Sequence, residues 1–217
     1  MNLSNSQKKI VSNVAWSLGG KAVNMASALF VGILIARYLG PESYGLMNYV
    51  ISYVAIFSII ATFGMDNIEI RELSRQNDKK DAIMGTCFCL RMFFATIAYI
   101  VIAISLFYFQ TDKFTSLMVL AYGLTLFTGT GNLLRNYFTS IVQNKYIVKS
   151  EMYRTFVGAG IKILLLWIKA PLEYFIYAQI FDTALVASGY YLSYKSTVGS
   201  IRKWHFDKTL VPFILKE

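Results

Sequence analysis

Residues 44–65 read YGLMNYVISYVAIFSIIATFGM, a run that contains no charged side chain. A helix needs about 20 predominantly apolar residues to cross the hydrocarbon core of a bilayer, which is roughly 30 Å thick. This run therefore predicts a membrane-spanning helix. Residues 92–110 and 114–134 are also free of charge, and they predict two more.

Three further apolar stretches each carry a charge within them: Lys21, Lys162 and Asp182. We predict an all-α polytopic membrane protein in which six transmembrane helices form one bundle. The approximate spans are 14–36, 44–65, 84–110, 114–134, 152–168 and 174–194. For the fifth of these, an amphipathic helix on the membrane surface is the alternative.

The composition agrees with a membrane protein. Of the 217 residues, 56% are hydrophobic and only 15% are charged, with a mean hydropathy of +0.49. Soluble domains are nearer one quarter charged. The net charge of +9 has an ordinary source, because cytoplasmic loops of membrane proteins are rich in Lys and Arg, so no nucleic-acid partner is expected. The two cysteines are too few for a disulfide framework or a closed zinc site.

The distribution of basic residues predicts the orientation. With six spans and a cytoplasmic N-terminus, fifteen Lys and Arg residues lie inside and three outside (Arg37, Lys113 and Lys169). Both termini are therefore predicted to be cytoplasmic. The expected organisation is an interfacial or cytoplasmic segment 1–13, the transmembrane bundle 14–194 and a basic cytoplasmic tail 195–217. Between spans two and three, residues 66–81 predict a surface helix with ion pairs such as that of Glu72 with Arg75.

Charged and polar residues inside spans usually face a protein interior or a water-filled cavity. Lys21 and Asn24 belong to a stripe of small and polar residues in the first span, which favours a cavity-lining face; close helix packing is the alternative. Lys21 and Arg91 lie at similar depth from the cytoplasmic side. Together they could attract an anionic headgroup, whereas the alternative for Arg91 is a side chain that reaches back to the interface as an anchor.

Lys162 and Asp182 flank the turn at Pro171 at similar distances, so an ion pair between them is geometrically possible. Such a pair could be structural, or it could be a coupling site that opens during transport. Lys21, Asn24, Arg91 and Lys162 are therefore the candidates for a cationic substrate cavity. No catalytic constellation is found, since the single histidine, His205, has no identifiable partner, and the sequence predicts neither a metal nor a cofactor.

Two short motifs carry a resemblance to a known family. Residues 37–45 read RYLGPESYG between the first two spans, and residues 64–71 read GMDNIEIR after the second. Together they resemble the polysaccharide biosynthesis (Wzx-type O-antigen and capsule repeat-unit) flippases, a family of the multidrug/oligosaccharidyl-lipid/polysaccharide exporter superfamily. The residues that carry this interfacial family motif are Arg37, Gly40, Pro41, Gly45, Gly64 and Arg71.

The resemblance implies an all-helical transporter with two six-helix bundles around a central cavity. Its members flip undecaprenyl-pyrophosphate-linked oligosaccharide repeat units across the bacterial inner membrane for lipopolysaccharide or capsule biosynthesis. The implied partners are the lipid-linked oligosaccharide, membrane lipids, and the polysaccharide polymerase and chain-length machinery. The chain is then expected to be the N-terminal half of such a transporter, either as a fragment or as a half that pairs with another.

Two other functions agree with the same residues. One is a cation-coupled small-molecule exporter of the same superfamily, in which Asp182 and Lys162 form the coupling site. The other is a non-transporting membrane scaffold in a polysaccharide assembly complex. In each of these readings the protein is not an enzyme.

Overall fold

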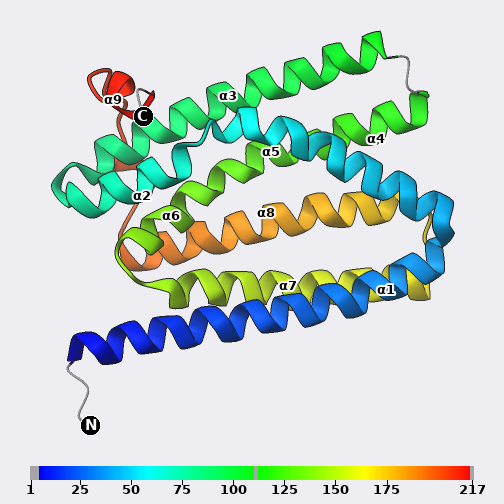
Figure 1. Ribbon diagram of the computed structural model, residues 1–217, viewed down its shortest axis with the longest axis horizontal. Helices are drawn as coiled ribbons and strands as arrows, with labels where there is room; N and C mark the ends of the chain where they lie inside the picture. The colour runs from blue at the N-terminus through cyan, green and yellow to red at the C-terminus, as the bar shows by residue number, and fades with distance from the viewer. Residues whose placement is uncertain (1–4, 110–111, 216–217) are drawn as a thin grey trace.

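The computed structural model describes residues 5–109 and 112–215, so residues 1–4 of the predicted N-terminal segment and residues 216–217 of the predicted tail lie outside it (Figure 1). The described part of the chain is helical and contains no strand. Its elements are α1 (Asn5–Thr62), α2 (Met65–Arg75), η1 (Asn77–Lys79), α3 (Lys80–Tyr108), α4 (Lys113–Gly123), α5 (Thr125–Thr128), η2 (Gly129–Gly131), α6 (Asn132–Ser140), α7 (Asn144–Trp167), α8 (Leu172–Thr197), η3 (Ile201–Lys203) and α9 (Val211–Leu215).

Helix α1 consists of two helices that meet at a sharp kink at Gly40 (Figure 1). Gly40 has φ 73° and ψ 174°, a conformation that residues with a Cβ adopt only under strain. Pro41 follows it, where the fixed φ of proline suits the first turn of a helix. The two halves therefore form the hairpin that the sequence predicted between the first two spans.

The segment from α4 to α6 is helical throughout but not uniform. Its middle, η2, is a three-residue 3-10 turn that joins α5 to α6. Helices α7 and α8 form a second hairpin around Pro171, and the Tyr38 hydroxyl donates to the Ala170 carbonyl at 3.1 Å, which ties the two hairpin turns together.

Helix α7 begins well before the predicted start at position 152. Its first turns are amphipathic: Ile147 and Val148 are buried, whereas Lys145 and Lys149 are exposed on the other side. The basic side chains made this stretch look like a loop in the sequence, but helical spacing separates them from the buried face.

Three helical stretches are long and apolar enough to cross a membrane: Leu18–Thr62, Lys80–Tyr108 and Lys113–Ser140. Helices α7 and α8 are long enough to cross a membrane but are not among these stretches. Polar residues such as Lys162, Gln179 and Asp182 lower their mean hydropathy. The structure thus describes an all-helical membrane protein, and the count of six spans stays a prediction.

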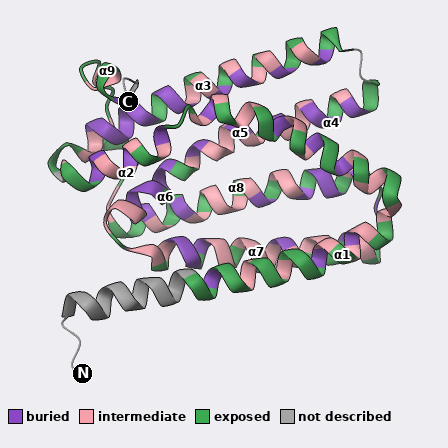
Figure 2. Ribbon diagram, in the orientation of Figure 1, coloured by how far each residue is buried: buried purple, intermediate pink, exposed green. Residues whose placement is uncertain are grey.

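Two apolar cores lie one after the other along the bundle, and buried residues occur at intervals along α3 and α8 (Figure 2). The first core is near the hairpin turns and is built from residues such as Val50, Ile102 and Ile176. The second is near α2 and contains Met65, Leu133 and residues of the C-terminal segment. Each of the long helices α3 and α8 contributes to both cores.

Helix α2 differs from the surface helix predicted from its charges. Glu69, Glu72 and Leu73 are buried against the second core. The Glu72 carboxylate accepts hydrogen bonds from Arg71 and Gln76, both at 3.0 Å, in place of the expected ion pair with Arg75. The left-handed Gly64 (φ 68°) turns the chain at the end of α1, so that α2 packs against the bundle.

The C-terminal segment folds back onto the start of α3. The backbone N–H of Asp207 donates to the Thr86 hydroxyl at 3.0 Å, and Ile214 is buried in the second core. Gly85 makes this contact possible, because a Cβ on it would lie 2.6 Å from the backbone nitrogen of His205. In its described part, the predicted basic tail thus contacts the bundle through Asp207 and Ile214, while Arg202, Lys203 and Lys208 are exposed.

Replacing Gly85 with valine should detach this segment, since the obstructing atoms belong to the backbone and cannot rotate away. We expect the free energy of unfolding to fall by about 1–3 kcal/mol, as for other overpacked sites. Trypsin should then cut faster after Arg202 and Lys203, which limited proteolysis would show. Gly160→Val is the matched control, because a Cβ on Gly160 meets open space. Equal cleavage rates in both variants would contradict the packing role.

Candidate functional site

A layer of polar side chains lies between the two apolar cores. In α3, Arg91 follows Leu90 of the second core and precedes Ala95 of the first. In α8, Asp182 lies between Ala178 of the first core and Tyr190 of the second. We call this set of residues the polar layer: Asn24, Arg91, Glu151, Arg154, Lys162 and Asp182.

Part of the polar layer faces a cavity of about 300 Å³, which we call the central cavity. Both halves of α1 contribute to its wall, together with α7 and α8. Its volume lies at the lower end of the range for small-molecule sites. The polar side chains that line it are Asn24, Ser27, Tyr44, Asn48, Arg154, Thr155, Lys162, Gln179 and Asp182.

Lys162 and Asp182 form an ion pair in this cavity, with 2.5 Å between Nζ and Oδ2, and Lys162 also contacts Gln179 Oε1 at 3.3 Å. The structure thus contains the pair that the sequence indicated as possible. Gly158 on α7 leaves space for it, because a Cβ there would lie 2.9 Å from Cγ of Asp182. The other carboxylate oxygen, Oδ1, is buried without a hydrogen-bond partner among the described residues.

Arg154 supplies a second positive charge to the central cavity. Its Nε atom is buried and has no hydrogen-bond partner in the part of the chain that the structure describes. From the sequence, Arg154 is predicted to be one of the cytoplasmic basic residues, at the edge of a span that begins at position 152. Since α7 begins at Asn144, Arg154 lies well inside the helix.

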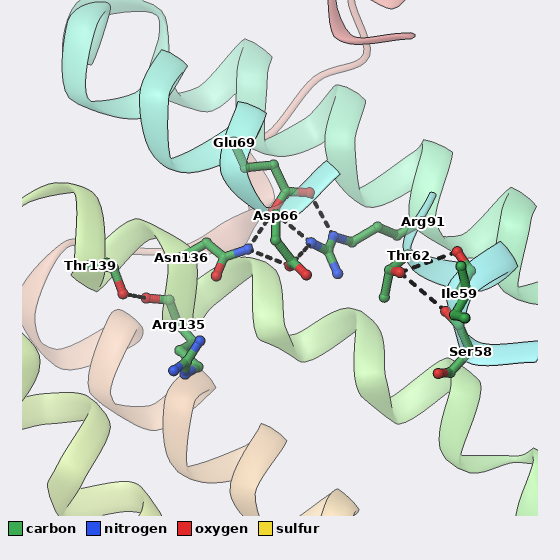
Figure 3. A network of polar contacts seen from close by, with 9 residues as sticks. All are labelled: Ser58, Ile59, Thr62, Asp66, Glu69, Arg91, Arg135, Asn136 and Thr139. Atoms are coloured by element: carbon green, nitrogen blue, oxygen red, sulfur yellow. Dashed lines mark hydrogen bonds and ion pairs between the residues drawn. The ribbon is translucent and has the colours of Figure 1, made fainter. Parts of the chain in front are cut away.

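Arg91 is placed differently from the expectation of an open cationic site. Its side chain is 2% exposed, and it binds Glu69 through Nε at 2.6 Å and through Nη2 at 2.7 Å (Figure 3). Nη2 also lies 2.6 Å from Asp66 Oδ1, while the amide of Asn136 donates to both carboxylates at 2.7–2.8 Å. With these contacts, Arg91 is neither a free cation in an open cavity nor a side chain that reaches back to the membrane interface.

The two carboxylates of this cluster respond differently to their surroundings. Burial raises the pKa of Glu69, which is 0% exposed. Burial acts in the same direction on Asp66, but hydrogen bonds from Arg91 and Asn136 outweigh it and lower the pKa of that carboxyl. The cluster thus compensates the charge of Arg91 inside the protein.

The remaining predicted residues lie in separate places. Lys21 is exposed on α1 and is not part of the wall of the central cavity. Asn24 lines the cavity, donates to Glu151 Oε2 at 3.4 Å and accepts a short hydrogen bond from Thr155. Of the four candidates for a cationic cavity, Asn24 and Lys162 are therefore brought together, while Lys21 and Arg91 are not.

The family motif residues surround the second half of α1. Gly40 and Gly64, both with positive φ, lie at its two ends. Arg37, Pro41 and Gly45 are exposed near the first turn. Arg71 lies on α2, where it contacts Glu72. These residues shape the chain around the bundle, and none of them lines the central cavity.

Long apolar helices around a polar interior define a membrane protein whose bundle contains a polar cavity. The sequence model of the polysaccharide biosynthesis protein family matches residues 10–216. The chain belongs to this family, which confirms the resemblance that the motifs indicated. No curated protein and no solved structure matches the chain significantly.

Proposed function

We propose that the chain takes part in flipping polyprenyl-pyrophosphate-linked oligosaccharide repeat units across the bacterial inner membrane, as the N-terminal part of a longer transporter. Undecaprenyl is the expected lipid, and the flipped unit would pass to the polymerase and chain-length machinery. The observation that carries this proposal is the central cavity, which is lined by the half-buried cations Lys162 and Arg154, in a chain that belongs to a family of polysaccharide biosynthesis proteins.

The chemistry of the cavity suits such a substrate. Arginine can bind phosphate oxygens through two parallel N–H groups, and Arg154 has a donor that is not otherwise used. Asn48 and Gln179 offer amide groups to sugar hydroxyls. A cavity of about 300 Å³ holds only part of a lipid-linked oligosaccharide, so we expect the other half of the transporter to supply the opposite wall.

The same proposal includes the six-span topology with both termini in the cytoplasm. The two halves of α1, then α3, the stretch from α4 to α6, α7 and α8 supply the six spans. At the end of the bundle opposite α2, Phe107, Tyr108 and Trp167 are each more than 70% exposed. Aromatic side chains gather in this way at membrane–water interfaces, which supports an outer boundary there.

The proposal is tested by expressing the complete protein in a flippase-deficient strain and measuring surface glycan. We expect the wild type to restore the glycan and Gly32→Phe to abolish it, because Gly32 lines the central cavity and a side chain there enters open space. Gly19→Phe is the control, since Gly19 is exposed on the same helix and outside the cavity wall. Restored glycan with Gly32→Phe would contradict a substrate path through this cavity.

One observation favours a second function, the cation-coupled export of small molecules. The Oδ1 atom of Asp182 is a buried carboxylate oxygen without a partner in the described chain, and such an oxygen can bind a proton or a metal cation. In the same strain, drug resistance that depends on Asp182 and appears without surface glycan would favour this function.

A further inference from the structure

An apolar groove of about 210 Å³ lies outside the central cavity and shares no lining residue with it. We call it the lateral groove. Its walls come from α3, from the stretch between α5 and α6, from α8, and from η3 in the C-terminal segment. The larger apolar side chains in these walls include Phe88, Leu133, Leu134, Tyr191, Ile201 and Trp204.

The chemistry of the lateral groove suits a hydrocarbon chain. No charged side chain lines it in the part of the chain that the structure describes. Its two threonine hydroxyls are already used, since Thr130 donates to the Phe127 carbonyl at 2.7 Å and Thr128 to the Thr125 carbonyl at 3.1 Å. A bound water needs two or more free polar partners, so the groove offers little to water.

The rim of the lateral groove is open to its surroundings. Phe88, Tyr191 and Ile201 are each 37–39% exposed. Helix α3, which carries Phe88, is long and apolar enough to cross a membrane, so these surroundings are lipid. A lipid chain gains no hydrophobic free energy when it moves from the bilayer into an apolar groove. The groove can therefore hold a chain, but the choice among lipids must come from the headgroup.

Two cations lie at one end of the lateral groove. Ile201 and Trp204 line the groove, and Arg202 and Lys203 stand between them in η3. Both basic side chains are exposed, and neither has an ion pair among the described residues. Tryptophan prefers the boundary between membrane and water. The two unpaired cations are therefore expected at the level of the lipid headgroups.

We infer that the lateral groove binds one anionic glycerophospholipid, with an acyl chain in the groove and the negative headgroup at Arg202 and Lys203. Basic residues beside a membrane attract anionic lipids, and the groove gives one such lipid a fixed position. The site goes beyond the proposed function, because it lies outside the central cavity. Only the assignment to the cytoplasmic leaflet uses the proposed topology.

The fluorescence of Trp204 can report on this site. Its indole is held in the groove wall by a hydrogen bond to the Tyr194 hydroxyl at 3.2 Å and by the ring of Phe88, whose centroid is 5.9 Å away. Of the three tryptophans, Trp16 and Trp167 are replaced by phenylalanine, so that Trp204 alone emits. The full chain is placed in vesicles of phosphatidylcholine and phosphatidylglycerol. Bromine atoms on the acyl chains of one lipid or the other then quench the indole on contact.

We expect phosphatidylglycerol to bind about 20-fold more strongly than phosphatidylcholine, since each basic residue near the headgroups contributes about fivefold. Arg202→Gln with Lys203→Gln should lower this preference to about one, and both residues are exposed, so the fold should persist. Lys145→Gln with Lys149→Gln is the matched control, because it removes the same charge from exposed positions on α7 outside the groove. Equal binding of both lipids to the wild type, or a full preference in the Arg202 and Lys203 variant, would overturn the site.

A second variant tests the groove itself. Ala187 lines it, so the ring in Ala187→Phe should take the place of the acyl chain and reduce quenching by both brominated lipids at least threefold. Ala184→Phe is the control, since Ala184 is exposed on the same helix and lies outside the groove wall. Undiminished quenching in folded Ala187→Phe protein would overturn an acyl chain in the groove. If this variant does not fold, the Arg202 and Lys203 result decides.

Competition separates a phospholipid from the lipid-linked substrate. Unlabelled phosphatidylglycerol should relieve the quenching by its brominated form more strongly than a polyprenyl phosphate does at the same mole fraction. Stronger relief by the polyprenyl phosphate would assign the groove to the substrate tail and overturn the phospholipid site. The outcome is independent of flipping: if the complete protein does not restore glycan but the lipid preference depends on Arg202 and Lys203, flipping is overturned and the lipid site stands.

Discussion

Arg91→Ala is expected to lower the free energy of unfolding by about 3–5 kcal/mol, the usual cost of removing one partner from a buried ion pair. The reason is that Glu69, which is 0% exposed, would lose its only cationic partner among the described residues. Asp66 would lose its ion pair as well. The loss should appear as a lower midpoint of thermal unfolding in mild detergent and a smaller yield of folded protein.

Two variants make this result specific. Arg75→Ala removes an exposed guanidinium from α2 and should leave the midpoint unchanged. Arg91→Met combined with Glu69→Met should recover most of the stability, because apolar residues often replace a buried pair without loss. A wild-type midpoint in Arg91→Ala, accompanied by loss of surface glycan, would instead assign Arg91 to the substrate.

Lys162→Met is expected to have two effects, one on stability and one on transport. Asp182 would remain buried at 6% exposure without a cation, which should again lower the free energy of unfolding by about 3–5 kcal/mol. The central cavity would also lose one of its two cations. Surface glycan in the complemented strain should fall to the level of the empty vector.

A double variant separates these effects. Lys162→Met with Asp182→Leu removes both charges, so thermal stability should return towards the wild-type value while surface glycan stays absent. Of the two cations that line the cavity, Arg154 would then remain, and we expect one cation to be too few for the phosphoryl group. If the double variant restores both stability and glycan, the pair is structural and the substrate takes its charge compensation elsewhere.

Local patterns in the sequence were enough for much of the fold. Residues 44–65 form a long apolar run, and the helix that the structure contains there, up to Thr62, needs no partner to be predicted. Gly40 and Pro41 mark a chain reversal by their own backbone preferences. A pair between Lys162 and Asp182 could also be named as possible, because a tight hairpin at Pro171 brings positions at similar distances from the turn to similar depth, and the structure contains this pair.

Contacts between distant segments could not be predicted in this way. Arg91 meets Glu69 and Asn136 because Gly64 turns α2 inwards, and a charged helix on its own is indistinguishable from a surface helix. Arg154 was missed for a related reason, since the exposed Lys145 and Lys149 hid the true start of α7. A helical periodicity that continues through a basic stretch is the signal that could have found it.

The 3-10 turn η2 has a mechanical consequence. It separates Leu126 of the first core from Leu133 of the second, so it spans the gap between two firmly packed bodies. Such turns have poorer hydrogen-bond geometry than an α-helix, and they often mark hinges. Bending at η2 would move Arg135 on α6 while Met118 on α4 keeps its packing in the first core. The segment from α4 to α6 can therefore bend at a hinge that lies at the level of the buried charges.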